Sequence, residues 1–387
     1  MYRIGINALG FKNESGGPQS SIYNTVKYLL KNDNENKYFL FVAKNNEYVF
    51  EDLKHFPNLK VIVYPIDSNN STIRVITEHT FLVLGILKHR IQLMHHNFNY
   101  MPRFCPTKSI TTLHDLSGFF FYENLPHTKV MTRYYNYLKN NMAYTFKHAK
   151  KVIVISEFTR SEVHKYYDGI SDDLMITIPQ SLDSRKNTAA IREQIFEDFN
   201  INKPYILSVS VVRPHKNFPF LIKIFNKIKE RYKIPHQLVI SGKMGVEMQG
   251  LEKNDFLEEI ESSPYKKDIK YVGFTSSEDL ASLYTNADLY VTTTLYEGFG
   301  SPLIEAMRYK LPIACSNAAS LPEVGGNGCI YFDPYNEDDA CEKVYKLISD
   351  KNLRKNILIK QKERLEYYSW DRIAKQIIKL YSEVINE

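Results

Sequence analysis

Two cationic side chains, Arg213 and Lys216, stand three positions apart at the end of an apolar run and directly before a helical pattern. A guanidinium binds phosphate oxygens as a fork, and an ammonium adds a compact positive charge. The unpaired N–H groups at a helix N-terminus attract anions as well. This spacing therefore predicts a diphosphate site, and the alternative interpretation is a solvated basic turn.

A second loop places Glu297 and Glu305 on either side of Gly298 and Gly300. The glycines leave backbone amides accessible ahead of a helix, and carboxylates accept hydrogen bonds from sugar hydroxyls. Leu303 occupies the position of the third glycine of the dinucleotide fingerprint, which argues against a dehydrogenase. The pattern favours a sugar or phosphate site over a glycine turn with a carboxylate at a helix start.

Gly16 and Gly17 lie between the first apolar run and the first helical pattern. Two glycines allow close backbone approach to an anion at a helix N-terminus. The loop is not a P-loop, because no Gly-Lys-Ser/Thr follows it. An anion site and a tight turn without a ligand are equal alternatives here.

Polar residues also end two apolar runs in the first half of the chain: His114 with Asp115, and His96 with Asn97. In open α/β sheets, ligands bind at the carboxyl ends of strands. His114 could exchange a hydrogen bond with a polar substrate, and the alternative is a packed histidine with Asp115 as a helix cap. The pair His95 and His96 should point to opposite faces of a strand. Because no third ligand group accompanies this pair, we predict no metal there.

No Asp-x-Asp pair occurs in the chain, so the simplest carboxylate pair for holding a divalent ion against a nucleotide diphosphate is missing. The four cysteines, Cys105, Cys315, Cys329 and Cys341, show no metal-ligand spacing. We therefore expect neither a metal nor another cofactor, and we expect the reduced thiols of a cytoplasmic protein.

The elements that must position these residues alternate along the chain. Short runs rich in Val and Ile predict buried parallel strands, and helical patterns such as 18–31 and 217–232 separate them. The order predicts an α/β protein with two parallel sheets, and thus two domains. The polar stretch 183–190 is the expected boundary. The expected strands are residues 3–9, 38–43, 59–66, 91–95, 109–113 and 151–155, then 205–212, 237–241, 269–274, 288–294 and 312–316.

Composition excludes several classes of protein. With 387 residues, 43% hydrophobic and 24% charged, the chain is neither disordered nor too short for two or three domains. No apolar run approaches the length of a transmembrane helix, and the N-terminus reads as a strand and not as a signal peptide. The net charge of +6 falls within residues 1–185, which hold 22 Lys/Arg against 16 Asp/Glu. This excess is too small to argue for nucleic acid.

The segment 71–90 predicts a helix with several apolar residues near Lys88 and Arg90. The favoured interpretation is a core helix with a solvated basic end. The alternative is contact with an anionic membrane surface, to which each cation near the surface would contribute.

The segment 271–326, with its Glu297-to-Glu305 element, resembles the signature region of the retaining glycosyltransferases of family 4 (glycosyltransferase group 1). The loop 212–217, the glycine loop, residues 113–115 and the segment 155–163 match the same family in order. The resemblance covers nearly the whole chain and implies the GT-B fold: two Rossmann-like domains with a cleft between them. It implies an N-terminal acceptor domain at 1–185, a sugar-nucleotide domain at 186–366, and a C-terminal helix at 367–387 that crosses back to the first domain.

The resemblance also implies roles for individual residues. Arg213 and Lys216 would contact the donor diphosphate, Glu305 the ribose hydroxyls, and His114 the transferred sugar. Many relatives have an arginine where this chain has Val211, and we assign that role to Arg213. Many also have Asn-Gly at the position of Gln180 and Ser181. The catalytic candidates are His114, Arg213, Lys216 and Glu297; the donor-binding candidates are Gly16, Gly17, Arg213, Lys216, Glu297, Gly298, Phe299, Gly300, Ser301 and Glu305; the acceptor-side candidates are His96, Asn97 and Asp115.

The function implied is metal-independent transfer of a hexose-type sugar from a UDP- or GDP-type nucleotide sugar to a glycan or lipid-linked acceptor. Bacterial members commonly build O-antigen, capsule or other surface polysaccharide, so we expect that role at the inner face of the plasma membrane, with peripheral contact through the N-terminal domain. The alternatives are a sugar-nucleotide epimerase or phosphorylase on the same fold, and a non-catalytic sugar-nucleotide or glycan-binding protein. Feeding a sugar nucleotide without acceptor and looking for its epimer separates these classes.

Overall fold

The computed structural model describes residues 1–11, 17–125, 127–182, 192–245 and 254–387. Contacts divide the chain into two compact units. Unit 1 comprises Met1–Tyr122, Lys129–Asp183 and Tyr368–Glu387, and unit 2 comprises Glu123–Thr128 and Ser184–Tyr367. The predicted boundary stretch 183–190 lies outside the described residues, so the domain limits at 185 and 366 stay predictions.

Unit 1 contains a parallel sheet whose seven described strands run in the order β3-β2-β1-β4-β5-β6-β7. β1 pairs with both β2 and β4, so the order reverses at β1, as in a doubly wound sheet. The strands are β1 (Arg3–Asn7), β2 (Lys37–Ala43), β3 (Leu59–Tyr64), β4 (Leu93–His96), β5 (Lys108–Leu113), β6 (Lys151–Val154) and β7 (Met175–Thr177).

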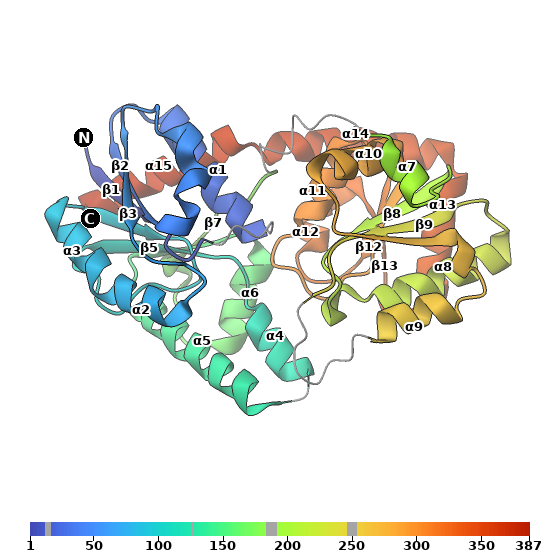
Figure 1. The fold of residues 1–387 in the computed structure, drawn as a ribbon, viewed down its shortest axis with the longest axis horizontal. Helices are drawn as coiled ribbons and strands as arrows, with labels where there is room; N and C mark the ends of the chain where they lie inside the picture. Colours follow the sequence, from blue (N-terminus) through green and yellow to red (C-terminus); the bar gives the residue numbers. More distant parts are fainter. Residues whose placement is uncertain (12–16, 126, 183–191, 246–253) are drawn as a thin grey trace. The chain divides into compact units, whose positions relative to one another are not determined.

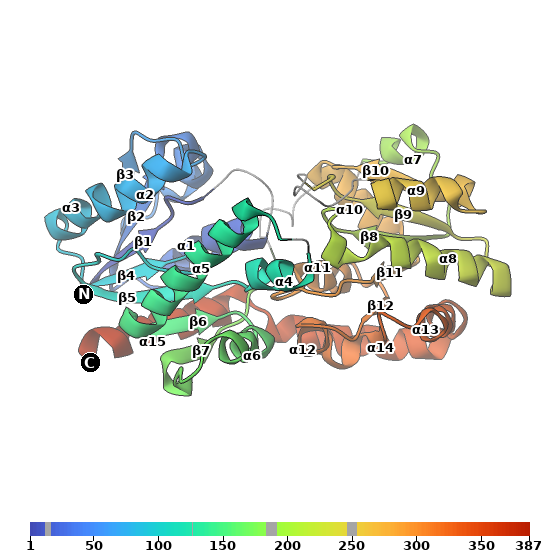
Figure 2. The ribbon, with the colours of Figure 1, turned by 90° about the horizontal axis from the view of Figure 1, so that it is seen from below.

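Helices cover both faces of this sheet (Figures 1 and 2). α15, from the far end of the chain, packs beside α1, and together they close the core around Val26, Ile373 and Tyr381 (Figure 1). The helical segments are α1 (Gly17–Asn32), η1 (Lys44–Leu53), α2 (Ser71–His79), α3 (Phe81–Lys88), α4 (Ser117–Asn124), α5 (Lys129–His148), α6 (Glu157–Tyr166), η2 (Asp172–Leu174) and α15 (Trp370–Asn386).

Unit 2 repeats the architecture with six described parallel strands in the order β10-β9-β8-β11-β12-β13. The strands are β8 (Tyr205–Val209), β9 (Gln237–Ser241), β10 (Ile269–Gly273), β11 (Leu289–Thr292), β12 (Ile313–Ser316) and β13 (Ile330–Phe332). The helical segments are α7 (Gln194–Asp198), η4 (Pro214–Lys216), α8 (Phe218–Tyr232), α9 (Asn254–Ser262), η5 (Lys266–Asp268), α10 (Ser277–Asn286), α11 (Ser301–Arg308), α12 (Leu321–Gly325), η6 (Gly326–Gly328), α13 (Glu337–Ser349) and α14 (Lys351–Tyr367).

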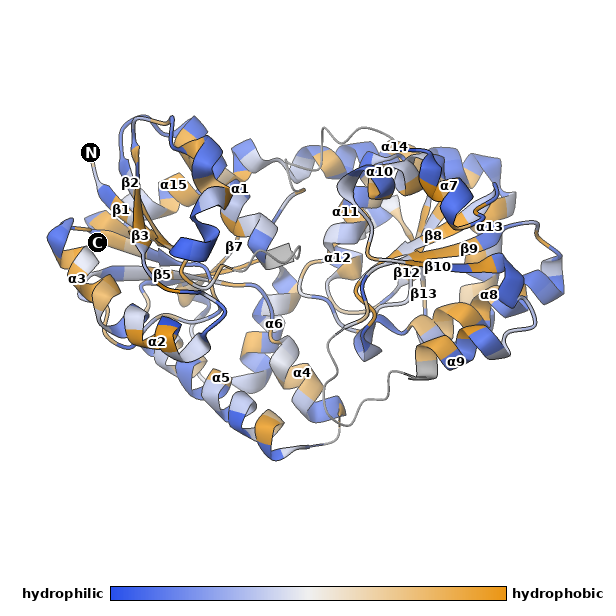
Figure 3. Ribbon diagram, viewed as in Figure 1, coloured by the Kyte–Doolittle hydropathy of each residue, from blue (hydrophilic) through white to orange (hydrophobic). Residues whose placement is uncertain are grey.

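The predicted α/β class with two parallel Rossmann-like sheets is confirmed, and the strands are the hydrophobic centre of each unit (Figure 3). Several strands are shorter than the apolar runs that predicted them. The run 205–212 gives a strand that ends at Val209, because residues after it turn into a loop. β7 and β13 were missed, since three residues are too few to show a pattern. The helix expected at 71–90 is two helices that meet at Thr80. In the described residues, no helix is both long and apolar enough to span a bilayer.

Candidate functional site

The loop that follows β8 carries the two predicted cations of unit 2. Arg213 is exposed and directly precedes η4, and Lys216, the last residue of η4, is buried. Asn217 then adopts a left-handed conformation with φ +54°, which asparagine tolerates better than most residues, and α8 begins. The Thr293 hydroxyl donates to the backbone carbonyls of Lys216 and Asn217, at 3.0 and 2.9 Å. Thr293, which directly follows the neighbouring strand β11, thus holds this turn in place.

Lys216 and Glu297 form an ion pair, so the structure brings together the cation of one predicted loop and the carboxylate of the other. The Ser320 hydroxyl donates to the Glu297 carbonyl at 2.8 Å and fixes the backbone of the second loop. Gly300 has φ +91°, and a Cβ there would lie 2.8 Å from Cδ2 of Leu321. The loop therefore needs glycine at this position before α11 begins at Ser301.

Glu305, in the second turn of α11, accepts a hydrogen bond from the Tyr284 hydroxyl at 3.2 Å. Tyr284 is buried, and burial together with the Glu305 carboxylate raises the pKa of its hydroxyl well above the ordinary value. Its ring stacks on Tyr309 with centroids 5.1 Å apart. Sequence reasoning missed Tyr284, because one tyrosine among many apolar residues of a helix carries no signal.

His215, next to Lys216, is neutral in this environment. Burial, followed by the charges of Lys216 and Arg213, lowers the pKa of His215 to about 2. Its backbone carbonyl accepts from the Leu295 amide at 2.7 Å, which ties the two loops together once more. The positive charge of this site thus comes from Arg213, Lys216 and the α11 N-terminus.

In unit 1, His114 directly follows β5, and both of its ring nitrogens are hydrogen-bonded. Nε2 lies 3.0 Å from the carbonyl oxygen of Asn97, and Nδ1 lies 2.7 Å from Nε2 of Gln180. These partners assign the tautomer in which Nε2–H donates to Asn97 and Nδ1 accepts from the Gln180 amide. Burial lowers the pKa of His114, so the ring is neutral at pH 7. Sequence reasoning noted Gln180 only as a departure from the family and did not foresee this contact.

Asp115 caps a helix, which is the alternative role that the sequence also allowed. Its Oδ1 accepts from the Ser117 amide at 2.9 Å and from the Ser117 hydroxyl at 2.6 Å, where α4 begins. Asn97 is buried, and its Nδ2 has no hydrogen-bond partner within the described part of the chain. The roles of Asp115 and Asn97 toward an acceptor stay predictions.

The two adjacent histidines point to opposite faces of β4, as expected. His95 is hydrogen-bonded to the hydroxyls of Tyr381 (2.6 Å) and Thr112 (2.7 Å). His96 is fully buried, and its ring nitrogens lie 3.5 Å from Nδ2 of Asn7 and from Oγ of Ser109. Burial lowers the pKa of each ring to about 3. His96 thus has no surface from which to reach an acceptor in this conformation.

A pocket of about 660 Å³ opens beside His114 and Asp115 in unit 1, within the size range of small-molecule sites. α2 and α5 form its walls, and the hydroxyls of Tyr100 and Tyr137 meet across it at 3.2 Å. Sequence analysis did not predict this lining. The pocket is lined by Ser71, Thr72, Arg74, Val75, Ile76, Phe98, Asn99, Tyr100, His114, Asp115, Tyr134, Tyr137 and Leu138.

Three further predictions concern the glycine loop, a metal site and the cysteines. Gly16 lies outside the described residues, and Gly17 is the first residue of α1. Within the described ranges, no group of three or more His, Cys, Asp or Glu side chains is arranged to hold a metal ion. The four cysteines are free thiols.

Two Rossmann-like units of this kind define the GT-B class, and solved structures share the fold. Sucrose-phosphate synthase from Thermosynechococcus elongatus matches with a TM-score of 0.76 and 17% identity over 100% of both chains. Anabaena Alr3699/HepE in complex with UDP and glucose matches with a TM-score of 0.69 and 16% identity, over 99% of this chain and 100% of that one.

Family models identify the chain. The model for glycosyl transferases group 1 matches residues 191–364, and the model for Glycosyltransferase Family 4 matches residues 15–186. The chain belongs to this glycosyltransferase family. It is 26% identical to O-antigen chain mannosyltransferase B of Escherichia coli over 276 residues, 71% of this chain and 70% of that protein. It spans 34% of the length of a second, larger E. coli mannosyltransferase.

Proposed function

We propose that this chain is a retaining transferase that moves a hexose-type sugar, mannose foremost, from a UDP- or GDP-type nucleotide sugar to a glycan or lipid-linked acceptor. The observation that carries the proposal is the contact of Lys216 with Glu297 beside the glycine-bounded N-terminus of α11. The mannosyltransferase relatives favour mannose, and the UDP complex of Alr3699/HepE supports a nucleotide sugar as donor. Their O-antigen role favours surface polysaccharide synthesis, with peripheral membrane contact through residues 1–185.

The donor would bind to unit 2. Arg213, Lys216 and the amides of residues 298–301 would hold the diphosphate, and Glu305 would accept hydrogen bonds from the ribose hydroxyls. Glu297 would orient the sugar and so discriminate between donor sugars. Charge builds on the leaving diphosphate in the transition state, where fixed positive groups in a partly buried site act most strongly.

The acceptor would bind to the pocket of unit 1. Its tyrosines offer flat faces for the apolar side of a sugar ring, and Arg74 and Asp115 offer a donor and an acceptor for its hydroxyls. The neutral His114, oriented by Asn97 and Gln180, would contact the transferred sugar. Asp115 caps α4, which makes it a poor nucleophile.

These residues favour a reaction on one face of the sugar. The bond between the anomeric carbon and the diphosphate oxygen breaks, an oxocarbenium-like centre forms, and the acceptor oxygen attacks from the side of the leaving group. The departing diphosphate takes the proton of the acceptor hydroxyl, so that no separate base is needed. The configuration at the anomeric carbon is retained.

A thermal-shift screen of nucleoside diphosphates and their sugar conjugates tests the donor assignment. A ligand at 100 times its dissociation constant should stabilise the protein by about 2.7 kcal/mol. Transfer from the preferred donor to a synthetic glycan, followed by determination of the anomeric configuration, tests the reaction. Failure of every nucleoside diphosphate to stabilise the chain would refute the proposal.

The same assays separate the alternatives. An epimerase would convert the sugar nucleotide without acceptor, and a phosphorylase would require inorganic phosphate. A binding protein would be stabilised by the donor and would form no product under any of these conditions.

A further inference from the structure

The pocket of unit 1 contains a cation that has no ion-pair partner among the described residues. Arg74, the fourth residue of α2, lines this pocket and is partly buried. Its Nε is buried, and no hydrogen-bond acceptor of the described chain reaches it. A charge that is withdrawn from water is unfavourable unless a partner compensates for it, and a guanidinium keeps its charge in proteins. Arg74 therefore indicates a ligand that supplies the missing negative charge.

Two carboxylates could compensate Arg74, but each is engaged elsewhere. Glu78 lies four positions further along α2, and its Oε1 accepts from Nδ2 of Asn7 at 3.3 Å. Burial raises the pKa of the Glu78 carboxyl against the opposing effect of the Arg74 charge, which makes Glu78 a weak counter-ion. Asp115, the one carboxylate of the pocket lining, accepts from the amide and the hydroxyl of Ser117. Neither carboxylate thus takes the place of a bound anion.

Neutral hydroxyl groups complete the polar lining of the pocket. Burial raises the pKa of Tyr100 and of Tyr134, so both phenols stay protonated at neutral pH and can donate hydrogen bonds. The hydroxyl of Tyr137 lies 3.2 Å from that of Tyr100, and Ser71 and Thr72 add two hydroxyls at the start of α2. A guanidinium that shares a pocket with several O–H donors suits an anionic group with several oxygens.

We propose that the pocket of unit 1 takes an acceptor that carries an anionic group, phosphate or carboxylate, and that Arg74 binds this group. The guanidinium would hold two of its oxygens as a fork, and the tyrosine hydroxyls would donate to the others. Asp115 would repel the same group, and this repulsion would set which end of the acceptor meets Arg74.

The same chemistry could come from two sources: a phosphorylated or acidic sugar, or the diphosphate of a lipid-linked glycan. That the ligand is the acceptor of sugar transfer rests on the proposed function. Binding of the anionic group by Arg74 does not.

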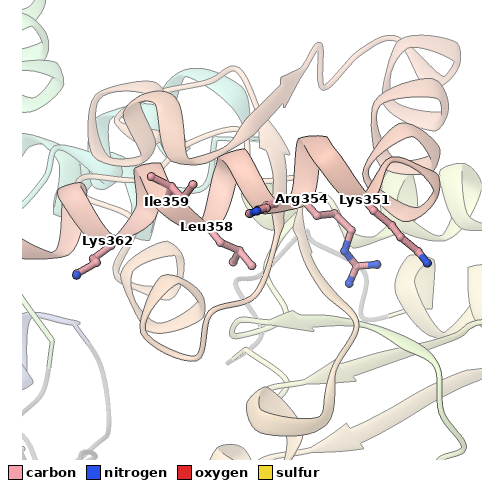
Figure 4. Close-up of a pocket in the computed structure, with 6 residues that line it drawn as sticks. Lys351, Arg354, Leu358, Ile359 and Lys362 are labelled. Atoms are coloured by element: carbon pink, nitrogen blue, oxygen red, sulfur yellow. The ribbon is translucent and has the colours of Figure 1, made fainter.

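A groove of about 750 Å³ along α14 of unit 2 provides a matched control (Figure 4). It is lined by Lys351, Arg354, Lys355, Leu358, Ile359 and Lys362. Arg354 is paired with Asp288 at 2.7 Å, and Lys355 is exposed. This lining has positive charge but no hydroxyl group, so we expect only weak anion binding that salt screens.

Calorimetric titration of the full chain tests the proposal. Three charged probes are each compared with an uncharged counterpart: mannose-6-phosphate and mannuronic acid with mannose, and a short-chain prenyl diphosphate glycoside with the prenyl glycoside. The preferred nucleoside diphosphate is present at saturation, so that the proposed donor site is filled. At least one charged probe should bind about tenfold or more tightly than its counterpart. A preference confined to the prenyl diphosphate would assign the lipid-linked source, and a preference for a soluble probe the sugar source.

Arg74→Gln should lose this preference and bind charged and uncharged probes alike. Arg74→Lys keeps the charge without the fork and should retain part of the preference. Lys355→Gln, in the α14 groove, should behave as the parent does. All three variants should keep the parent's stabilisation by the nucleoside diphosphate, because neither residue lies in the proposed donor site. If Arg74→Gln does not fold, Arg74→Lys decides, and full preference in that variant would contradict the proposal.

Transfer assays add a kinetic readout. Arg74→Gln should raise the KM for the charged acceptor by about tenfold, with the kcat and the KM for the donor within about twofold of the parent. The proposal is overturned if the parent binds all charged and uncharged probes alike, if Arg74→Gln keeps the preference, or if Lys355→Gln loses it. Failure of every nucleoside diphosphate to bind would refute the donor assignment alone; the same titrations without nucleotide would still decide the role of Arg74.

Discussion

Lys216 and Glu297 form an ion pair in unit 2 although they are 81 positions apart in the chain. Their side chains are 10% and 21% exposed, and they follow neighbouring parallel strands, β8 and β11. The pair holds the ammonium in place before any ligand arrives. In the proposed donor site, a diphosphate would meet a cation whose position is already set, an arrangement that favours stabilisation of a transition state.

Replacing either cation should reduce turnover more than acceptor binding. We expect Lys216→Ala and Arg213→Ala to lower kcat by about 10²–10³, because the charge on the leaving diphosphate grows in the transition state. Initial rates at saturating donor measure this effect. Lys216→Ala also leaves Glu297 without its partner, so the double variant with Glu297→Gln serves as the control. Turnover of both single variants within about twofold of the parent would exclude the role.

Glu305→Gln should weaken binding of the nucleoside diphosphate itself. A hydrogen bond to a charged group contributes about 1.5–3 kcal/mol, so the dissociation constant should rise about tenfold or more. Tyr284→Phe removes the 3.2 Å bond that orients the carboxylate and should have a smaller effect. Calorimetry measures both, with Glu278→Gln, an exposed carboxylate of α10, as the matched control. An unchanged affinity in Glu305→Gln would contradict the ribose contact.

Gly300→Ala should damage the second loop through two separate costs. Its φ of +91° costs about 1–2 kcal/mol for a residue with a side chain, and the added Cβ meets Leu321 at 2.8 Å. Gly273→Ala is the matched control, because Gly273 has φ +67° and nothing within 4 Å of the added Cβ. The melting temperature of Gly300→Ala should be lower than that of Gly273→Ala. The rate of sugar transfer should fall only in Gly300→Ala. Equal melting temperatures would show that the loop has room to adjust.

Stability should fall as the pH drops below about 6.5, the ordinary pKa of histidine. Burial lowers the pKa of His95 to about 3, so the unfolded chain takes up the proton first as the pH falls. The stability is thus fully present above pH 6.5 and is lost progressively toward pH 3, at up to about 1.4 kcal/mol per pH unit. Urea midpoints of His95→Gln should depend less on pH than those of the parent. His55→Gln, at an exposed histidine, should behave as the parent; if all three respond alike, His95 is not the cause.

Transfer should continue without a divalent metal. The chain has no Asp-x-Asp pair, and in the proposed donor site Arg213, Lys216 and the α11 N-terminus would supply the positive charge that a metal would otherwise provide. Initial rates in a chelator should match those in buffer alone. Complete loss of transfer in the chelator, restored by magnesium or manganese, would contradict this prediction.

The residues of the two proposed donor-binding loops could be found in the sequence because each loop is a local unit. A run of Val and Ile, a turn and a helical pattern follow one another, and the carboxyl ends of parallel strands meet at one edge of the sheet. Arg213 and Lys216, or Glu297 and Glu305, could therefore be selected as candidates from their local pattern, whereas their individual roles came only from the family resemblance. The same local reasoning predicted the two sheets and the opposite orientations of His95 and His96.

Contacts between distant segments were decided only by the tertiary structure. Gln180 meets His114 across 66 positions, and Tyr284 meets Glu305 across 21, yet neither partner differs locally from an ordinary core or loop residue. Nothing in the sequence indicated that Arg74 lines the pocket of unit 1. The helices α2 and α5 are brought together by packing and not by chain order.

The segment 71–90 shows both what the sequence determined and what only the tertiary structure decided. Its sequence by itself determined helices rich in apolar residues with a basic end, since propensity and spacing act within a few residues. Only the tertiary structure decided that Gly85 lies against Phe41 and Tyr64. That contact divides the apolar residues of α3 into a buried face and an exposed one, because burial depends on which neighbour reaches the helix and not on the residues of the helix alone.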